Sequence, residues 1–231
     1  MNALLLSAGY GKRLRPLTKN TPKCLLPINN TNLLEHWIEK LKKAKVKKIL
    51  INTHFRHDLI KKFIIKKNAQ KFVKLVHEKK LLGTAKTLFK NKNFFKDDFL
   101  LIHGDNYCEE DIKKLIQAHK KRPKKCLITM LTFKTTMPEK CGVIKTDNKK
   151  RVIKIYEKKN FFLTNTKIAN AAVFIISKKF LIKYNPKKNE VDFCKDIIPK
   201  YLKRIYTFHT RKFFEDIGSS KGYKKIIRFI K

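Results

Sequence analysis

Cations cluster behind a glycine-containing loop near the start of the chain. The run SAGYG at residues 7–11 follows the apolar segment Ala3–Leu6, which suits a strand buried on both faces. Cations come after it, among them Lys12, Arg13, Arg15 and Lys23. Glycines allow backbone N–H groups to approach an anion, and the cations neutralise its charge. The stretch is therefore interpreted as a phosphate-binding loop, against the alternative of a tight turn with a solvated basic face.

This loop departs from two common glycine-rich phosphate motifs. Arg13 stands where a Walker motif has Ser or Thr, and Leu6 stands where that motif begins with glycine. Leu14 occupies the place of the third glycine in a dinucleotide-binding fingerprint. The distinguishing feature is the dense set of cations, to which Lys23 is added where the chain comes back at Pro22.

Aspartates stand at two later turns. Asp105 follows the buried-strand pattern of Phe99–His103, and the carboxyl ends of such strands form the ligand-binding edge of open α/β sheets. Asp216 follows another apolar stretch and directly precedes Ile217, Gly218 and a helix start. The alternative for Asp105 is a strand end that binds no ligand, and the alternative for Asp216 is a simple helix cap.

A third motif is Leu82-Gly83-Thr84-Ala85, with Glu78 before it. Thr84 is a potential N-cap for a helix over Ala85–Lys90, and the backbone donors of such a start could face a ring or a phosphate. Without further context, an ordinary helix start explains it equally well. The chain has seven glycines, and six of them lie in this motif and the others singled out in this section.

Apolar runs alternate with helical patterns along the chain. The predicted strands are Ala3–Leu6, Lys48–Asn52, Phe72–Val76, Phe99–His103, Leu127–Phe133, Val143–Lys145, Val152–Tyr156, Ala171–Ile176 and Ile205–Phe208. The predicted helices are Leu33–Lys45, Asp58–Lys67, Ala85–Lys90, one after the acidic residues 109–111, and one over Ser219–Ile230 with Ser219 as N-cap.

This alternation predicts βαβ units, and closely spaced strands between Cys126 and Ile176 indicate an antiparallel part. We expect a three-layer α/β/α sandwich with a mixed, mostly parallel central sheet. It would form one domain over residues 1–231, with two halves over 1–111 and 112–231.

The composition is strongly basic. There are 57 Lys and Arg residues against 18 Asp and Glu residues, a net charge of +39, which by itself favours nucleic-acid binding. Because the lysines are spread along the chain, we attribute the charge to a general bias and expect only nonspecific nucleic-acid binding at low salt.

Location can be predicted from what the sequence lacks. No apolar run approaches the ~20 residues of a membrane span, and no signal peptide is recognised. The five scattered cysteines, without a C-x-x-C pair, fit a reducing compartment. We expect a cytoplasmic protein with no membrane partner.

The first 28 residues resemble the entry motif of the sugar-1-phosphate nucleotidylyltransferases, also called NDP-sugar pyrophosphorylases. LLSAGYGKRLRPLT followed by PKCLLPI matches (L/A)AGxGxRLxPLT…PKxLxPI at nearly every fixed position. The resemblance covers the full chain and is slightly closer to mannose-1-phosphate guanylyltransferase-like members. It implies a Rossmann-like nucleotidyltransferase fold and transfer of a nucleotidyl group from an NTP to a sugar 1-phosphate, with release of pyrophosphate. By this resemblance the half over 1–111 would bind the nucleotide and the half over 112–231 would bind the sugar phosphate.

This resemblance also implies a nucleotide-binding set. Its members are Ser7, Ala8, Gly9, Gly11, Lys12, Arg13, Lys23, Glu78, Gly83, Thr84 and Asp105. Arg13 and Lys23 would bind the triphosphate, and Glu78 would contact the base edge, where a carboxylate can accept from guanine or uracil N–H groups. The likeness of VHEKKLLGTAKTL to guanylyl-transferring members favours GTP, with UTP and dTTP left open.

The family's remaining motifs imply a metal and an acceptor site. Asp105 and Asp216 would bind Mg²⁺, and with Arg13 and Lys23 they make up the implied catalytic set. The acceptor set is Gly142, Glu157 and Asn170 for sugar hydroxyls and Lys158 for the sugar phosphate. Two departures from the family pattern stand here: Lys159 replaces a proline, and Ala171-Ala172 replaces the glycine that usually follows Ala.

Two alternatives stay open. The first is a CTP-dependent cytidylyltransferase acting on a small alcohol phosphate such as phosphocholine, although that group lacks a clear Asp-Ile-Gly turn. The second is a nucleic-acid-binding protein on an inactive transferase scaffold. The joint presence of Arg13, Lys23, Asp105 and Asp216 disfavours it.

Overall fold

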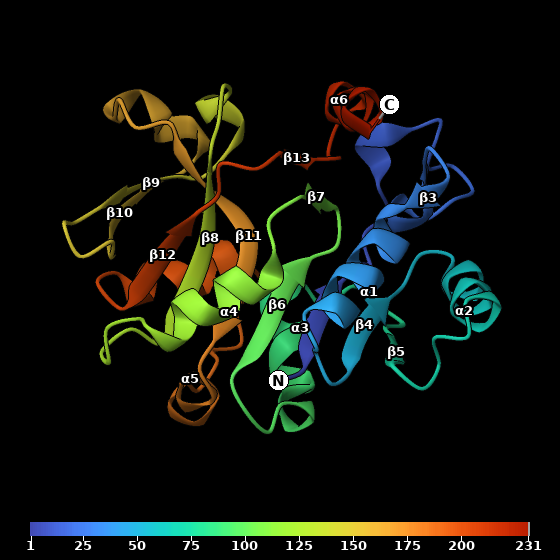
Figure 1. The fold of residues 1–231 in the computed structure, drawn as a ribbon, viewed down its shortest axis with the longest axis horizontal. Helices are drawn as coiled ribbons and strands as arrows, with labels where there is room; N and C mark the ends of the chain where they lie inside the picture. The colour runs from blue at the N-terminus through green and yellow to red at the C-terminus, as the bar shows by residue number, and fades with distance from the viewer. Residues whose placement is uncertain (231) are drawn as a thin grey trace.

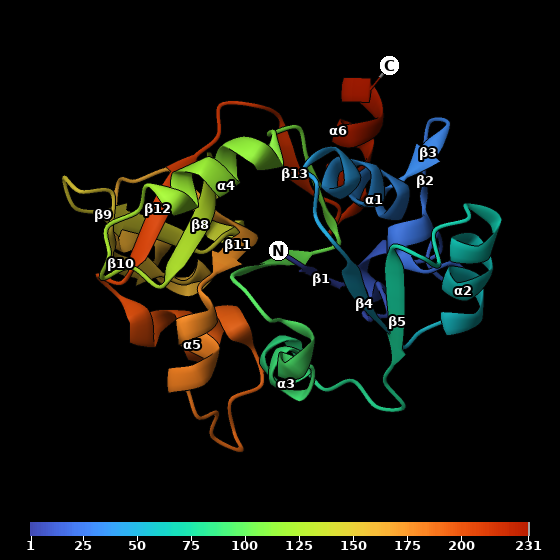
Figure 2. The ribbon, with the colours of Figure 1, turned by 60° about the horizontal axis from the view of Figure 1, so that its bottom comes forward.

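A computed structural model describes residues 1–230, and for Lys158 and Lys159 it describes the backbone alone. Helices cover both faces of one nine-stranded sheet, which makes three layers (Figure 1, Figure 2). The strands are β1 (Ala3–Leu6), β2 (Pro27–Ile28), β3 (Thr31–Asn32), β4 (Ile49–Thr53), β5 (Val73–His77), β6 (Phe99–His103), β7 (Asn106–Cys108), β8 (Ile128–Lys134), β9 (Val143–Thr146), β10 (Val152–Tyr156), β11 (Ile168–Ile176), β12 (Ile205–His209) and β13 (Phe214–Asp216). The α-helices are α1 (Leu33–Lys43), α2 (His57–Lys66), α3 (Thr84–Lys90), α4 (Ile112–Lys120), α5 (Lys178–Lys183) and α6 (Ser220–Ile230).

The central sheet is mixed, as the sequence predicts. Its order is β10-β9-β11-β6-β1-β4-β5, and β8 pairs with both β11 and β12. The strands β6, β1, β4 and β5 are parallel, whereas β11 pairs antiparallel with β6 and β8. Within the described sheet, β11 and β10 alone run against the direction of β1. Strands from both predicted halves therefore join one sheet.

Two apolar cores fill the spaces on either side of this sheet. Successive side chains of β1 alternate between them, with Ala3 and Leu5 on one side and Leu4 and Leu6 on the other. Helices α1, α2 and α4 cover the first side, and α3 and α5 cover the second (Figure 2). All four residues of β1 are buried, as expected for a parallel strand enclosed by two layers of helices. None of the helices within residues 1–230 is long and apolar enough to cross a membrane.

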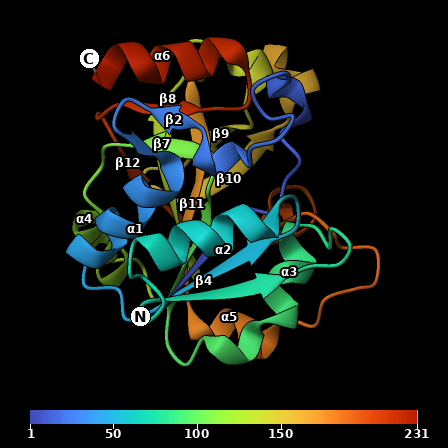
Figure 3. The ribbon, with the colours of Figure 1, turned by 90° about the vertical axis from the view of Figure 1, so that its right-hand side faces the viewer.

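A third, smaller core brings distant motifs together. Leu14 of the cation-rich loop, Ile28 of the PKCLLPI segment and Ile217 of the second aspartate turn pack with Ile226 of α6. Figure 3 shows α6 lying across the end of the molecule opposite the N-terminus, close to β2 and β7. Burial of these apolar side chains thus positions three segments that carry the predicted chemistry.

Helix α1 is tied to the strand that follows Asp105. The side chain of Asn32 caps the helix by accepting from the backbone N–H of Glu35 at 2.9 Å. Farther along, the Trp37 indole donates to the carbonyl of Asn106 in β7 at 2.8 Å. Because Trp37 is fully buried, this bond holds β7 against the helix and fixes the turn at Gly104–Asp105.

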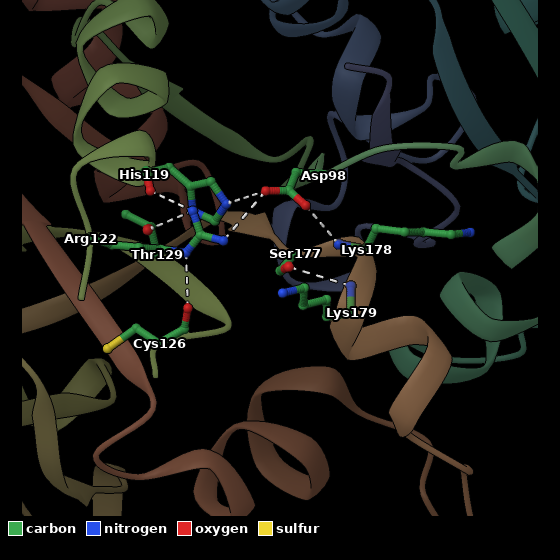
Figure 4. A network of polar contacts seen from close by, with 8 residues as sticks. All are labelled: Asp98, His119, Arg122, Cys126, Thr129, Ser177, Lys178 and Lys179. Carbon is green, nitrogen blue, oxygen red and sulfur yellow. Dashed lines mark hydrogen bonds and ion pairs between the residues drawn. The ribbon is translucent and has the colours of Figure 1, made fainter. Parts of the chain in front are cut away.

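A polar network around Asp98 joins α4 and α5 to the start of β6 (Figure 4). The carboxylate of Asp98 meets His119 Nε2 at 3.1 Å, and it accepts from the backbone N–H of Lys178 at 2.8 Å. Burial alone would raise the pKa of Asp98, but the hydrogen bonds from His119 and Lys178 lower it to about 2. The network fastens a helix from each outer layer to the same strand.

Most element positions agree with the sequence prediction, and the exceptions are short or irregular. β1, β6 and β10 have the predicted bounds, whereas β11 begins at Ile168, three residues before the predicted start at Ala171. A register shift against β8 lies between Asn170 and Phe174, where Ala172 has a φ of 51°. Residues before that irregularity do not continue the apolar pattern, which explains the late predicted start.

Candidate functional site

Two cavities meet at the carboxyl end of β6. The first has a volume of about 250 Å³ and lies against β1 and the loop after it. The second has a volume of about 350 Å³ and lies against β9, β10 and β11. His103 and Asp105 line both cavities. The site therefore has two compartments with a common wall, at the sheet edge where α/β folds bind ligands.

Most residues expected to bind the nucleotide line the first cavity. They are Ser7, Ala8, Gly9, Lys23, Glu78, Gly83, Thr84 and Asp105. The expected residues Gly11, Lys12 and Arg13 are not among the described residues that line it. Gly11 turns the chain with a φ of 66°, so Lys12 and Arg13 begin a short 3-10 helix instead. Arg13 lines the second cavity.

Lys23 lies between the two predicted aspartates. Its Nζ is 2.6 Å from Asp105 Oδ2 and 3.7 Å from Asp216 Oδ1. The two aspartates come from segments 111 residues apart, but β7 and β13 pair with Asn106 opposite Asp216. This register places Asp216 beside the residue that follows Asp105, so the short β7–β13 ribbon assembles the cluster.

The two carboxylates have opposite pKa shifts. Burial alone would raise the pKa of Asp105, but the Lys23 ammonium and His103 hold its pKa below the ordinary value. Burial and the negative charge of Asp105 raise the pKa of Asp216. Asp105 is therefore the more firmly ionised of the pair, and the repulsion between the carboxylates favours a cation near both.

Gly218 allows Arg13 to approach this cluster. A Cβ at position 218 would lie 2.6 Å from Asp216 Oδ2 and 3.0 Å from Arg13 Nη2. Any larger residue would push the guanidinium and the carboxylate apart. The Asp-Ile-Gly turn thus places one positive group beside Asp216, in addition to Lys23.

Glu78 is held within a buried network. Its Oε1 accepts from the side chains of Asn52 at 2.9 Å and Thr87 at 2.5 Å. Its Oε2 accepts from the backbone N–H of Leu82 at 3.2 Å, and Asn52 in turn accepts from the backbone N–H of Ser7. The Glu78 carboxylate lines the first cavity, and through these hydrogen bonds it also fixes the loops around the cavity.

Thr84 links the first cavity to the second half of the chain. It was predicted as the N-cap of the helix, but that prediction is wrong: Gly83 is the N-cap and Thr84 is the first residue of α3. The Thr84 hydroxyl accepts from the backbone N–H of Phe193 at 2.7 Å instead. Phe193 begins a π-helix over Phe193–Ile197, an irregularity that often marks functional sites.

The predicted acceptor residues line the second cavity. Gly142, Glu157 and Asn170 all do so, and a Cβ at Gly142 would lie 3.9 Å from Glu157 Oε1. Asn170 is oriented by its own strand, since its Oδ1 accepts from the backbone N–H of Ala172 at 2.8 Å. The side chain of Lys158, the predicted phosphate ligand, lies outside the described part of the chain.

The cation-rich loop is tethered to the end of β4. His54 Nδ1 faces the carbonyl oxygen of Glu78 at 2.7 Å, and its Nε2 lies 2.7 Å from the Tyr10 hydroxyl. Because a carbonyl can only accept, Nδ1 of His54 carries a proton and donates to it, while Nε2 shares a hydrogen bond with the Tyr10 hydroxyl. Tyr10 is thereby held over the outer rim of the loop.

Several site residues carry weak sequence signals. Asn52 is a polar residue near the end of the apolar strand β4, and its role depends on partners at positions 7 and 78. His103 occupies the equivalent place on β6. The second cavity is also lined by Asp192, Cys194 and Lys195, which come from a segment without helical or strand periodicity. These residues can be identified as site residues only from the folded structure, which brings them to the same cavities.

The donor set suits a hard divalent cation. Asp105 and Asp216 supply two carboxylates, and no group of three or more His, Cys, Asp or Glu side chains within residues 1–230 could hold a metal ion. Magnesium is commonly held in this way, by one or two carboxylates together with substrate phosphates and water. The closeness of the two negative groups to one ammonium shows that positive charge is accommodated at this point.

Comparison with known proteins gives one consistent family. Residues 2–231 match the family model described as nucleotidyl transferase. The mannose-1-phosphate guanylyltransferase catalytic subunit beta of Drosophila pseudoobscura pseudoobscura is 31% identical, over 96% of this chain and 60% of the relative. A mannose-1-phosphate guanyltransferase of Aspergillus oryzae is 30% identical, over 96% of this chain and 62% of its own. The chain thus spans about three-fifths of the length of these curated relatives.

Solved structures share the whole fold. HddC from Yersinia pseudotuberculosis is 26% identical with a TM-score of 0.83, over 100% of this chain and 99% of its own. The same protein has also been solved in complex with GMP-PN, with a TM-score of 0.82. A structure from Bacillus anthracis at 24% identity has a TM-score of 0.87, over 99% of this chain and 94% of its own, and supports the fold.

Proposed function

This chain belongs to the nucleotidyl transferase family, and from that premise we propose that it transfers a nucleotidyl group from an NTP to a sugar 1-phosphate. The main support for this proposal is the pair of cavities that share Asp105 in their walls. The first would hold the nucleotide and the second the sugar phosphate. The α-phosphate of the NTP would then lie at the common wall, within reach of the acceptor.

The chemistry proposed is a direct in-line displacement. An oxygen of the sugar 1-phosphate forms a bond to the α-phosphorus, while the bond from that phosphorus to the pyrophosphate oxygen breaks. Lys23 and Arg13 neutralise the charge that develops on the phosphates, and Lys158 binds the acceptor phosphate. Glu157 and Asn170 orient the sugar. Such transfer depends chiefly on positioning and charge stabilisation, since little covalent help is needed.

Magnesium fits this proposal through Asp105 and Asp216. When held there, Mg²⁺ would supply positive charge that stabilises the negative charge on the substrate phosphates. Among the residues of the chain, Lys23 lies 2.6 Å from the Asp105 carboxylate and 3.7 Å from the Asp216 carboxylate, so its ammonium balances part of the negative charge of both. We expect Lys23 to turn toward the phosphates once a divalent cation and nucleotide are present.

Guanine is the proposed base. The relatives at about 30% identity are named as guanylyl-transferring enzymes, and HddC has been solved with a guanine nucleotide analogue. In this chain Glu78 fixes Asn52 and the backbone of Leu82 at the first cavity. We propose that this fixed frame, rather than an unengaged carboxylate, discriminates the base.

The test is a pyrophosphate-release screen with Mg²⁺. GTP, UTP, dTTP and CTP are each paired with mannose 1-phosphate, glucose 1-phosphate and phosphocholine, and the products are identified by mass spectrometry. We expect release with GTP and a sugar 1-phosphate. Release with CTP and phosphocholine alone would instead support the cytidylyltransferase alternative. No release with any pair would contradict the proposal.

A further inference from the structure

One histidine of the site has a buried ring nitrogen without a hydrogen-bond partner. Nε2 of His103 is inaccessible to solvent and makes no hydrogen bond within the described part of the chain. Buried polar atoms are usually paired, because the hydration lost on burial is otherwise not replaced. An unpaired nitrogen therefore costs stability in the free protein, and a ligand that pairs with it would recover that cost.

The position of His103 restricts what that ligand can be. It is the last residue of β6, two residues before Asp105, and it lines both cavities. The neighbouring Gly104 brings this strand end close to the phosphate loop, since a Cβ there would lie 2.5 Å from Ser7 Oγ. His103 thus lies on the common wall, beside the loop that would bind phosphates.

We propose that, when substrate binds, the His103 ring turns out of its enclosed position and donates a hydrogen bond from Nε2 to an oxygen of the phosphate that lies between the two cavities. This inference rests on the proposed function, in which that group is the α-phosphate. Phosphoryl oxygens accept and do not donate at neutral pH, so the bound tautomer has its proton on Nε2. His103 would join Lys23 and Arg13 as a hydrogen-bond donor at the reacting group.

The test replaces the imidazole by groups that differ in one property. His103→Phe keeps a flat ring but removes the donor, and His103→Gln offers an amide N–H at a similar reach. We expect His103→Phe to lower kcat/KM about 10- to 100-fold, the usual weight of a hydrogen bond to a charged group, and His103→Gln to restore part of it. We also expect His103→Phe to raise the Tm of the free protein by roughly 2–8 °C, because an unpaired polar atom is removed.

Binding measurements identify the contacted group. The probes are the nucleoside and the nucleoside 5′-monophosphate of the base preferred in the pyrophosphate screen, guanosine and GMP by expectation. His103→Phe should weaken binding of the monophosphate about 10-fold or more and leave that of the nucleoside within about twofold. Equal weakening of both would overturn the phosphate assignment.

His36 is the matched control. It is also a histidine beside a site strand, but its Nε2 lies 3.1 Å from the carbonyl oxygen of Cys108, and it lines neither cavity. His36→Phe should lower the Tm and leave kcat/KM unchanged. If His103→Phe lowers the Tm as His36→Phe does, with wild-type kcat/KM, then His103 is structural and the inference is wrong, while turnover by the wild-type protein leaves the proposed function standing.

Discussion

Lys23 is the residue on which both site carboxylates converge, so its charge should matter more than that of other lysines. Lys23→Met removes the ammonium that lies 2.6 Å from Asp105 and 3.7 Å from Asp216. We expect kcat to fall by about 10²–10³, as when a preorganised charge-stabilising donor is lost. Pyrophosphate release and circular dichroism measure activity and folding.

A lysine outside the cluster supplies the comparison. Lys19 is exposed, and it follows the same cation-rich loop. Lys19→Met changes the net charge equally and should leave kcat within about twofold, as is typical of an isolated surface charge. Equal losses in Lys19→Met and Lys23→Met would show that overall charge, rather than the cluster, sustains activity.

Ala172 carries a local strain that the sequence suggests. Its φ of 51° is in the left-handed region, which costs a residue with a Cβ about 1 kcal/mol or more. Ala172→Gly should therefore raise the free energy of unfolding by about 0.5–1 kcal/mol, after the added flexibility of the unfolded chain is subtracted. Urea denaturation measures the change.

The neighbouring alanine tests the same substitution without the strain. Ala171 is buried in β11 and is not among the described residues with positive φ. Ala171→Gly should lower the free energy of unfolding by about 1 kcal/mol, because glycine weakens a strand interior. A loss of stability in Ala172→Gly as well would mean that the strain at Ala172 is relieved by its surroundings.

At the residue scale, the sequence reveals the groups that stand in motifs and misses those defined by distant partners. Lys23, Asp105 and Asp216 follow recognisable turns, and the structure brings them together. Asn52 lies one residue before the end of β4 and His103 is the last residue of β6, so both look like ordinary polar residues near strand ends. Their importance depends on contacts across the sheet edge, which no local pattern encodes.

At the scale of elements, the contact between α3 and the π-helix joins the two cavities. Thr84→Val removes the acceptor of the buried Phe193 N–H while keeping the side chain's shape. We expect a loss of about 1–3 kcal/mol in the free energy of unfolding, the cost of a buried unpaired donor. Thr84→Ser keeps the acceptor and should lose less. Similar losses in both variants would assign the effect to packing of the methyl group.

The Asp98 network gives a pH-dependent contribution to stability. The folded pKa of about 2 lies below the unfolded value near 3.8, so the contribution is present above pH 4 and is lost as the pH falls toward 2. Because the side chain is 34% exposed, we expect about 1–2 kcal/mol at pH 7, less than the full shift would give.

The measurement compares wild type with Asp98→Asn by urea denaturation across this pH range. The difference in unfolding free energy should shrink between pH 4 and pH 2. A difference that stays constant down to pH 2 would show that the carboxylate's charge is not what stabilises the contact with α4 and α5.

Elements with a clear period are predictable, and those set by tertiary contacts are not. β1, β6 and β10 are continuous or alternating apolar runs, so their bounds follow from burial. β7 and β13 have three residues each, too few to show a period, although their pairing places Asp216. The π-helix over Phe193–Ile197 depends on the caps that Asp192 and Thr84 provide.

At the scale of the whole molecule, the net charge of +39 predicts binding that is electrostatic and nonspecific. Association with single-stranded RNA, followed by fluorescence anisotropy, should fall by about 10³ or more between 50 and 200 mM salt. A variant with Arg13, Lys23, Asp105 and Asp216 all replaced should behave nearly the same. Tight binding by that variant at physiological salt would revive a nucleic-acid-binding role.

The central claim is that two substrates held in adjoining cavities react directly with one another. The most direct measurement is pyrophosphate release from GTP with and without a sugar 1-phosphate, alongside quantification of the NDP-sugar formed. We predict no release without the acceptor, equal amounts of pyrophosphate and NDP-sugar with it, and loss of both in Asp105→Ala. Near-normal NDP-sugar synthesis by Asp105→Ala would contradict the proposed role of Asp105 as a metal ligand. A burst of pyrophosphate without acceptor, leaving nucleotide attached to the protein, would contradict direct transfer.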